Sequence, residues 1–255
     1  MATRGIAVYK NELYIGTQNI NFSRIHFTNP LLFKTVSAGA ILAYNLFEYV
    51  RNNHLALLFY NLFIPLAGIA SDGCEVWRYN DSLDKWSPVV SDQPGSMLSA
   101  GFGDKRNFAA AVIHEFKGDL YVGTAAGLML GCQLWRYNGT TWEKVVLPGG
   151  DGFGSKWNIY AWSMGCYNNS LYVGTLNFKP DKGCQLWRYN GWQWFKISLP
   201  GGDGFGERYN MGARSMVEYP ENSGGIVVGT FSLDVMSFRC FNGCEVWMNM
   251  PFNYN

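Results

Sequence analysis

The side chains that usually perform catalysis or bind metals are few in this sequence and form no recognisable motif. The histidines are His26, His54 and His114. Their spacing matches neither a His-x-x-x-His zinc motif nor a grouping of His with Cys that would supply metal ligands. We therefore predict no metal site and no cofactor, and we expect structural roles for the three histidines.

The six cysteines follow a structural pattern. Four recur at one position of an internal repeat, which places them in separate units where they are not expected to pair: Cys74, Cys132, Cys184 and Cys244. A buried free thiol packs like a small apolar side chain. The state of Cys166 and Cys240 stays open, and a disulfide between Cys166 and Cys184 is the alternative to free thiols.

Two loops with the sequence Gly-Gly-Asp-Gly-Phe-Gly, at 149–154 and 201–206, have the glycine content of phosphate-binding loops. Neither ends in Gly-Lys-Ser/Thr, and neither has the strand-then-helix setting that points backbone N–H groups at a phosphate. Glycine serves tight turns that need a positive φ, so we interpret both loops as connections between structural units. Calcium binding through Asp151 and Asp203 is the alternative, although few further oxygen ligands accompany them.

These residues belong to an internal repeat of roughly 50 residues. Its elements are a Leu-Tyr-Val-Gly-Thr strand, a Gly-Cys-x-x-Trp strand, a further Trp and a Gly-Phe-Gly loop. The first element begins at Leu13, Leu120, Leu171 and Ile226, and the second at Gly73, Gly131, Gly183 and Gly243. The further Trp is residue 86, 142 or 194, and the loops are 101–103, 152–154 and 204–206.

Each unit is expected to form four short strands. In one unit the strands are predicted at 162–167, 171–175, 184–189 and 192–199, with Asn190-Gly191 as a hairpin turn. Strand alternation gives the third of these two largely apolar faces. Such a sheet must be covered on both sides, which a radial arrangement of blades achieves. We predict an all-β fold, a β-propeller of four-stranded antiparallel blades, with a solenoid as the poorer alternative.

The Leu-Tyr-Val-Gly-Thr strand and residues 76–86, where Trp-Arg-Tyr-Asn precedes a second Trp, resemble a kelch-type propeller blade. The Gly-Cys-x-x-Trp-Arg-Tyr repeats are similar to those of largely uncharacterised bacterial and archaeal propeller proteins. Where kelch blades carry a Gly-Gly pair, this chain has Val-Gly-Thr. The resemblance covers most of the chain and implies one propeller domain over residues 1–255, with architecture similar to that of WD40 proteins.

One segment breaks the pattern. The step from Gly16 to Gly123 is two periods long, and residues 18–72 lack the expected motifs, so four recognisable units accompany one blade-length segment. This segment is a diverged blade, a helical replacement, or a blade read in a shifted frame. Residues 38–70 are strongly apolar, but the uncharged run at 55–70 contains Pro65 and is too short to predict a membrane span. Self-association through 38–70 is the expectation instead.

The two ends leave the ring open in this interpretation. Residues 6–9 correspond to the first strand of a blade, whereas 247–255 follow a third strand without the Trp of a fourth. We expect a five-unit ring closed imperfectly, or a piece of a longer propeller. Open blade edges would favour self-association.

Known enzymatic propeller sites find no match here. A copper site of the galactose oxidase kind needs Tyr and His together, and no repeat-aligned pair exists. A sialidase-like site needs three arginines, but Arg78, Arg136 and Arg188 are repeat residues beside tryptophans and suit stacking roles. The chain is therefore not expected to be an enzyme.

Propellers resembling this one bind ligands with the loops at one end of the blades, including the variable loop between the second and third strands. Here those loops are 125–130, 176–182 and 231–242. Because aromatic faces stack on sugar rings, we predict a non-catalytic, lectin-like carbohydrate-binding module, with a protein-interaction scaffold as the alternative. The candidate binding residues are Trp157, Tyr160, Phe178, Lys179, Asp181, Tyr209, Phe238 and Arg239.

Composition narrows the partners. The 255 residues include 30 Gly and 10 Trp, which suit short strands and tight turns rather than long helices. A net charge of +1, with 15% charged residues, offers no basic surface, so nucleic acid is not an expected partner. No signal-like leader begins the sequence, and an extracellular or cell-surface location is expected only for a fragment of a longer secreted chain.

Overall fold

The computed structural model describes residues 2–19, 71–127, 129–219, 225–233 and 243–249, and these residues form an all-β, almost entirely antiparallel structure. The strands group into consecutive blades. Blade 1 contains β1 (Ala2–Tyr9), β2 (Glu12–Gln18), β3 (Val76–Asn80) and β4 (Lys85–Val90). Blade 2 contains β5 (Asn107–Phe116), β6 (Asp119–Ala126), β7 (Leu134–Tyr137) and β8 (Trp142–Lys144).

The remaining strands repeat this pattern. Blade 3 contains β9 (Asn158–Tyr167), β10 (Ser170–Asn177), β11 (Leu186–Tyr189) and β12 (Trp194–Lys196), and blade 4 contains β13 (Asn210–Tyr219), β14 (Gly225–Ser232) and β15 (Val246–Asn249). Short 3-10 helices are η1 (Asp81–Leu83), η2 (Ala100–Gly103), η3 (Asp151–Gly154) and η4 (Asp203–Gly206). The predicted fold class, a β-propeller of antiparallel blades, is confirmed. No helix among the described residues has the length and apolar character needed to span a membrane.

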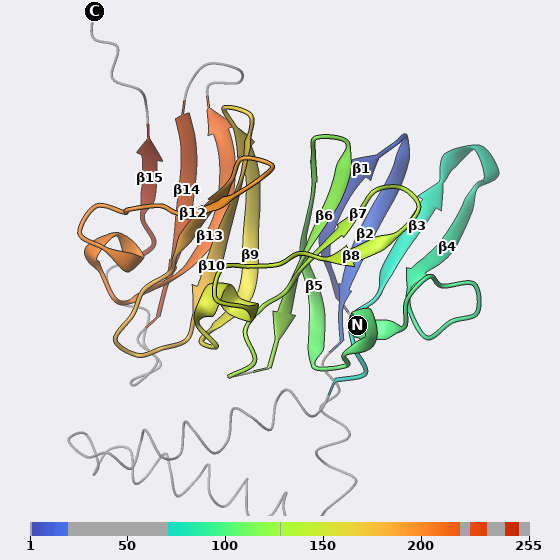
Figure 1. The fold of residues 1–255 in the computed structure, drawn as a ribbon, viewed down its shortest axis with the longest axis horizontal. Coiled ribbons are helices and arrows are strands. Elements are labelled where there is room, and N and C mark those ends of the chain that lie inside the picture. Colours follow the sequence, from blue (N-terminus) through green and yellow to red (C-terminus); the bar gives the residue numbers. More distant parts are fainter. Residues whose placement is uncertain (1, 20–70, 128, 220–224, 234–242, 250–255) are drawn as a thin grey trace, which may run out of the picture.

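Consecutive blades lie side by side, with blades 1 and 4 at the two ends of the row (Figure 1). The second strand of one blade touches the first strand of the next through single pairs: Gln18 with Ala109, Ala125 with Tyr160, and Leu176 with Gly212. The first strands also contact one another from blade to blade. These contacts make the first strand the inner strand of each blade.

The glycine of Val-Gly-Thr permits this close approach. A Cβ at Gly174 would lie 2.6 Å from the Cβ of Ala213 in the next blade, and one at Gly123 would lie 2.7 Å from the Cβ of Ala161. No larger side chain fits at these distances without moving the backbone. The repeated glycine is therefore a packing requirement between blades.

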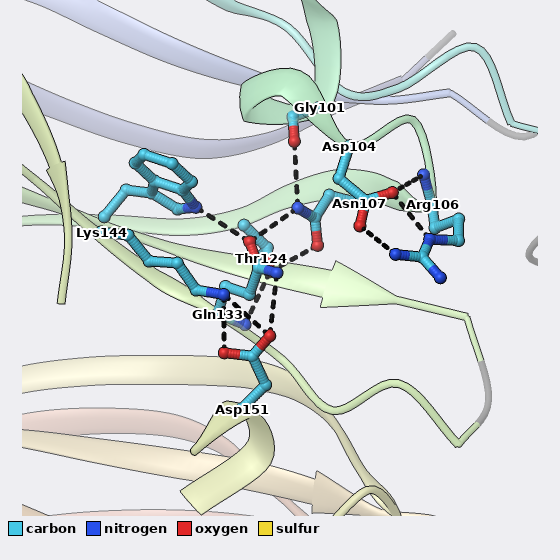
Figure 2. A network of polar contacts seen from close by, with 9 residues as sticks. Gly101, Asp104, Arg106, Asn107, Thr124, Gln133, Lys144 and Asp151 are labelled. Carbon is cyan, nitrogen blue, oxygen red and sulfur yellow. Dashed lines mark hydrogen bonds and ion pairs between the residues drawn. The ribbon is translucent and has the colours of Figure 1, made fainter. Parts of the chain in front are cut away.

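A buried polar network around an asparagine joins the inner strand to its own blade in blades 2, 3 and 4, and Figure 2 shows the network of blade 2. In blade 2, the Asn107 side-chain amide donates to the carbonyl of Gly101 and to Gln133 Oε1, both at 2.9 Å. Thr124 Oγ1 donates to Asn107 Oδ1 at 3.2 Å and accepts from the Gln133 backbone N–H at 2.9 Å. Because buried polar groups are costly without partners, this network fixes the register of the blade.

The aspartates of the two Gly-Gly-Asp loops belong to the same networks. Asp151 accepts from Gln133 Nε2 at 3.0 Å and from Lys144 Nζ at 2.8 Å. Asp203 is bound in the same way by Gln185 and Lys196. Both carboxylates neutralise a lysine of their own structural unit, and the described residues contain no cluster of His, Cys, Asp or Glu suited to a metal ion. The loops are connections between blades, as the sequence indicated.

Blade 1 is assembled from two distant parts of the chain. β2 pairs directly with β3, and the Thr17 N–H donates to the Glu75 carbonyl at 2.9 Å. Residues 19–75 therefore connect β2 to β3 within one blade. Gly16 lies in the second strand of blade 1 and Gly123 in the second strand of blade 2, so the described residues between them make up one blade repeat. Residues 20–70 lie outside the described residues, so the three interpretations of 18–72 stay predictions.

The cysteines are free thiols wherever the structure describes them, which excludes the Cys166–Cys184 disulfide. Cys74, Cys132 and Cys184 are fully buried. Burial raises the pKa of each of these three thiols to about 12. They are packing residues rather than nucleophiles, and Cys240 lies outside the described residues.

Candidate ligand-binding site

Most of the predicted binding residues lie at one end of the blades, where the second strands finish and the first strands begin. We call this the loop end. It contains the inter-blade connections 91–106, 145–157 and 197–209 and the β10–β11 loop at 178–185. The opposite end carries the short hairpin turns, including 190–193. Phe238 and Arg239 lie outside the described residues.

Trp157 and Phe178 form the centre of the candidate site. The Phe178 N–H donates to the Trp157 carbonyl at 2.9 Å, which links the residue before β9 to the residue after β10. Both side chains are half-buried and pack against an apolar cluster that includes Ile159, Leu176 and Met211. The packing and the backbone hydrogen bond hold two aromatic side chains side by side at the rim of blade 3.

Lys179 and Asp181 stand on the turn that follows Phe178. The Lys179 N–H donates to Asn177 Oδ1 at 2.9 Å, and the Lys182 N–H donates to the Lys179 carbonyl at 3.0 Å. These bonds shape a tight turn, across which Lys179 Nζ lies 3.7 Å from Asp181 Oδ1. The turn thus presents an accessible cation and anion next to the aromatic pair.

Tyr209 occupies the position in blade 4 that Trp157 occupies in blade 3. Its carbonyl accepts the Leu233 N–H at 2.9 Å, as the Trp157 carbonyl accepts that of Phe178. The Arg208 guanidinium lies 4.8 Å from the Tyr209 ring centroid and donates to its hydroxyl at 2.7 Å. Tyr209 is therefore a related rim position in the next blade, already covered on one side by arginine.

Tyr160 belongs to a different environment from the rim residues. Its ring centroid lies 5.5 Å from that of Phe108 and 5.6 Å from that of Trp162. Burial raises the pKa of the Tyr160 phenol, and the nearby guanidinium groups of Arg4 and Arg214 oppose that rise. Tyr160 contributes to an aromatic row on the inner strands, next to the rim pair.

The row continues through residues that the sequence did not single out for binding. The Trp162 ring lies 5.4 Å from Phe231, and the Arg214 guanidinium lies 4.6 Å from the Trp162 ring centroid. Trp162 and Arg214 stand where the pairing register shifts in β9 and β13. A β-bulge turns a side chain away from the regular alternation of a strand. The sequence signal that could have revealed these bulges is the run Ala161-Trp162-Ser163, which recurs as Ala213-Arg214-Ser215.

Ionisable groups elsewhere at the loop end are mostly paired. Arg106 Nη2 lies 2.7 Å from Asp104 Oδ2, and the hydrogen bond from Arg106 holds the pKa of the Asp104 carboxyl below its usual value. Lys105 Nζ lies 2.8 Å from Asp92. In blade 2, burial lowers the pKa of His114, which disfavours a charged imidazole. The pairs Arg106–Asp104 and Lys105–Asp92 stabilise a loop, and His114 is a half-buried strand residue. The aromatic pair is the feature of the described loop end that suits a ligand.

A surface hollow of about 460 Å³ lies away from the candidate site. It is lined mainly by blade 1, including Arg78, Lys85, Trp86 and Met97, with Tyr137 from blade 2. Four of these five side chains stand on strands β3, β4 and β7. The hollow belongs to the outer strands of blade 1, far along the row from Trp157 and Phe178, so we do not place the ligand there.

The fold and site together define an all-β blade protein of propeller architecture with an aromatic rim. No protein-family model and no curated protein matches the sequence. The chain is similar to a solved structure described as "Structure of SapL1 lectin in complex with alpha methyl fucoside", with 15% sequence identity and a TM-score of 0.38. The match covers 70% of this chain and 56% of that chain, so the chain spans just over half the length of that neighbour.

Proposed function

We propose that this protein is a non-catalytic carbohydrate-binding module and that the sugar rests on Trp157 and Phe178. The proposal depends on one observation: two half-buried aromatic side chains are held together at the rim of blade 3, beside an accessible ion pair. Sugar rings have apolar C–H faces that stack on aromatic rings and hydroxyl groups that need polar partners. The rim offers both kinds of contact within one short stretch of surface.

The ordering of the site favours binding. Immobilising a flexible side chain costs about 0.5–1.5 kcal/mol on association. Packing against Ile159 and Leu176 has already restricted the two rings in the free protein. Lys179 and Asp181 are accessible to solvent, so sugar hydroxyl groups can replace water as their hydrogen-bond partners. The free energy of stacking is therefore available to the complex rather than being lost to ordering.

A glycan array with the purified protein tests the proposal, followed by calorimetry with the best ligand. Trp157→Ala is expected to weaken binding by about fivefold or more, taking as the scale the roughly 1–3 kcal/mol that an aromatic side chain contributes when a nucleic-acid base stacks on it. Trp192→Ala is the matched control, because Trp192 is 92% exposed at the opposite end of blade 3. Absence of binding across the array, or equal binding by the Trp157 and Trp192 variants, would refute the proposal.

A protein-interaction scaffold is the second candidate function. The β2–β3 connection of blade 1, residues 19–75, is much longer than its counterparts at 127–133 and 178–185. Long insertions at a binding end commonly carry function. Deleting residues 20–70 should abolish co-purification of a specific partner and leave glycan binding through Trp157 intact. Co-purification of the same partner with the deletion variant would refute this second function. Kelch-like family membership stays a prediction.

A further inference from the structure

Each blade packs face to face against the next through equivalent positions. We call the face of a blade that contacts the next blade its forward face, and the face that contacts the previous blade its rear face. A Cβ at Gly5 on the forward face of blade 1 would lie 2.6 Å from Ile113 on the rear face of blade 2. In the same way, a Cβ at Gly165 would lie 3.1 Å from Met216. The interface is thus repeated along the chain.

The rear face of blade 1 is apolar, and none of the described residues covers it. Its Ile6 is paired with β2 in the same register as Ile113 in blade 2 and Met164 in blade 3. Ile113 and Met164 are 4% and 5% exposed, because the preceding blade covers them, whereas Ile6 is 65% exposed. Val8, two residues further along the same face, is exposed as well.

The forward face of blade 4, which would meet a following blade, is also left uncovered by the described residues. Val217 is 57% exposed, although its counterpart Gly165 is buried against blade 4. Tyr219 is exposed, whereas Tyr9 at the same position of blade 1 is buried. Gly229 is the glycine that in three other blades meets an alanine of the next blade, but among the described residues its Cβ position is approached by Ser215 of its own blade alone.

We infer that the forward face of blade 4 receives the rear face of blade 1 from a second copy of this chain. The two faces are the separated halves of an interface that the chain builds three times internally, so their shapes and apolar character match by repetition. Two copies of the four described blades would give eight, within the range of four to eight known for propellers. A head-to-tail contact closes into a ring at two copies when four blades turn through half a circle.

The internal interface predicts which residues meet across the two copies. Met216 lies against Gly165 where blade 4 packs on blade 3, so Ile6 of one copy should lie against Val217 of the other. Ala213 lies against Gly174, so Thr3 should lie near Gly229. Ile6 and Val217 are both exposed in the single chain, and their replacement should leave each copy folded.

Light scattering coupled to size exclusion, at tens of micromolar protein, tests the inference. The wild type should show twice the chain mass of 28.7 kDa. Ile6→Glu and Val217→Lys should each reduce the mass to that of one chain, because an isolated charge would be buried in the contact. The double variant should restore the dimer, since the introduced carboxylate and ammonium would then face each other. Val146→Glu, at an exposed loop position outside both faces, should remain dimeric.

The outcomes separate the alternatives. A wild type of single-chain mass refutes the inference and assigns the faces to some other partner. An oligomer that survives both single substitutions places the contact elsewhere and also refutes it. A ladder of larger masses that both substitutions abolish supports the head-to-tail contact and refutes closure at two copies. Circular dichroism spectra of all variants show whether a loss of mass comes from unfolding instead.

Discussion

Replacing Asn158 with alanine should strongly destabilise the protein. Asn158 is fully buried at the start of β9, where its side-chain amide donates to the Gly152 carbonyl and to Gln185 Oε1, both at 2.8 Å. Its Oδ1 also accepts from Thr175 Oγ1 at 3.3 Å. Alanine removes all three contacts at the point where the inter-blade loop, the inner strand and the second strand of blade 3 meet.

The structure sets the size of the effect. Gln185 Oε1 keeps a second donor in Trp187 Nε1, and the Gly152 carbonyl still accepts from the Ser155 N–H. Water cannot easily enter to replace the amide, since the site is closed. Losing two well-formed hydrogen bonds at about 1 kcal/mol each, and weakening a third, predicts a loss of roughly 2–4 kcal/mol in the free energy of unfolding.

Urea unfolding followed by tryptophan fluorescence measures this loss, with the slope of the transition checked against the wild type. Asn138→Ala is the matched control, because Asn138 is exposed in a hairpin turn and accepts from the Thr140 and Thr141 N–H groups, both at 2.8 Å. It should cost about 1 kcal/mol or less, as water can replace the lost contacts. Equal losses for the two variants would refute the view that the buried network holds the blade together.

Three further measurements test the packing of the blades. Gly174→Ala should destabilise the protein by about 2 kcal/mol or more, because the new methyl group would meet Ala213 of the next blade. Gly229→Ala should cost less, because its new methyl group meets a movable serine hydroxyl. Urea unfolding compares the two variants, and equal losses would contradict the close-approach argument. At pH 8 a maleimide should label the exposed Cys244 at once and should label the buried Cys132 only after unfolding. Peptide mass spectrometry identifies the labelled residue, and prompt labelling of Cys132 would disprove its burial. Burial raises the pKa of Cys132 from 9.0 to about 12, so the thiol of the unfolded state loses its proton first. The free energy of unfolding should therefore fall as pH rises from 9 toward 12. Cys132→Ala should lessen that fall in urea unfolding, and an unchanged pH dependence would contradict the raised pKa.

Much of the fold could be predicted because the repeat is written in local patterns. The Val-Gly-Thr and Gly-Cys-x-x-Trp strands, the Asn-Gly turn and the Gly-Phe-Gly loops each have a local physical cause, and each appears several times. Phe153, for example, stacks on Trp187 at 4.8 Å, and Phe102 stacks on Trp135 at 4.9 Å in the same way. Repetition turns weak local signals into a strong prediction of blades.

The candidate site was predictable only in part. The sequence indicated the loops, and the structure brings Trp157 and Phe178 together while placing Tyr160 in the inner aromatic row. The row itself, with Trp162 and Arg214, was missed because β-bulges at these residues break the alternation on which strand prediction depends. A one-residue change of register reverses the direction of a side chain, and pattern analysis assumes a constant register.

By itself, the sequence determined the strands of the blade and their order, because these follow from alternation, hydrogen bonding and turns among residues close in the chain. The close contact at the Val-Gly-Thr glycine joins different blades and came from the tertiary structure. Tertiary structure alone decided that β2 pairs with β3 across residues 19–75 and that Ile6 and Val217 lie on uncovered faces. Pairing between distant segments depends on which strand edge lies nearest in space, and spacing along the chain does not contain that information. The same limit explains why the period alone did not place β2 beside β3.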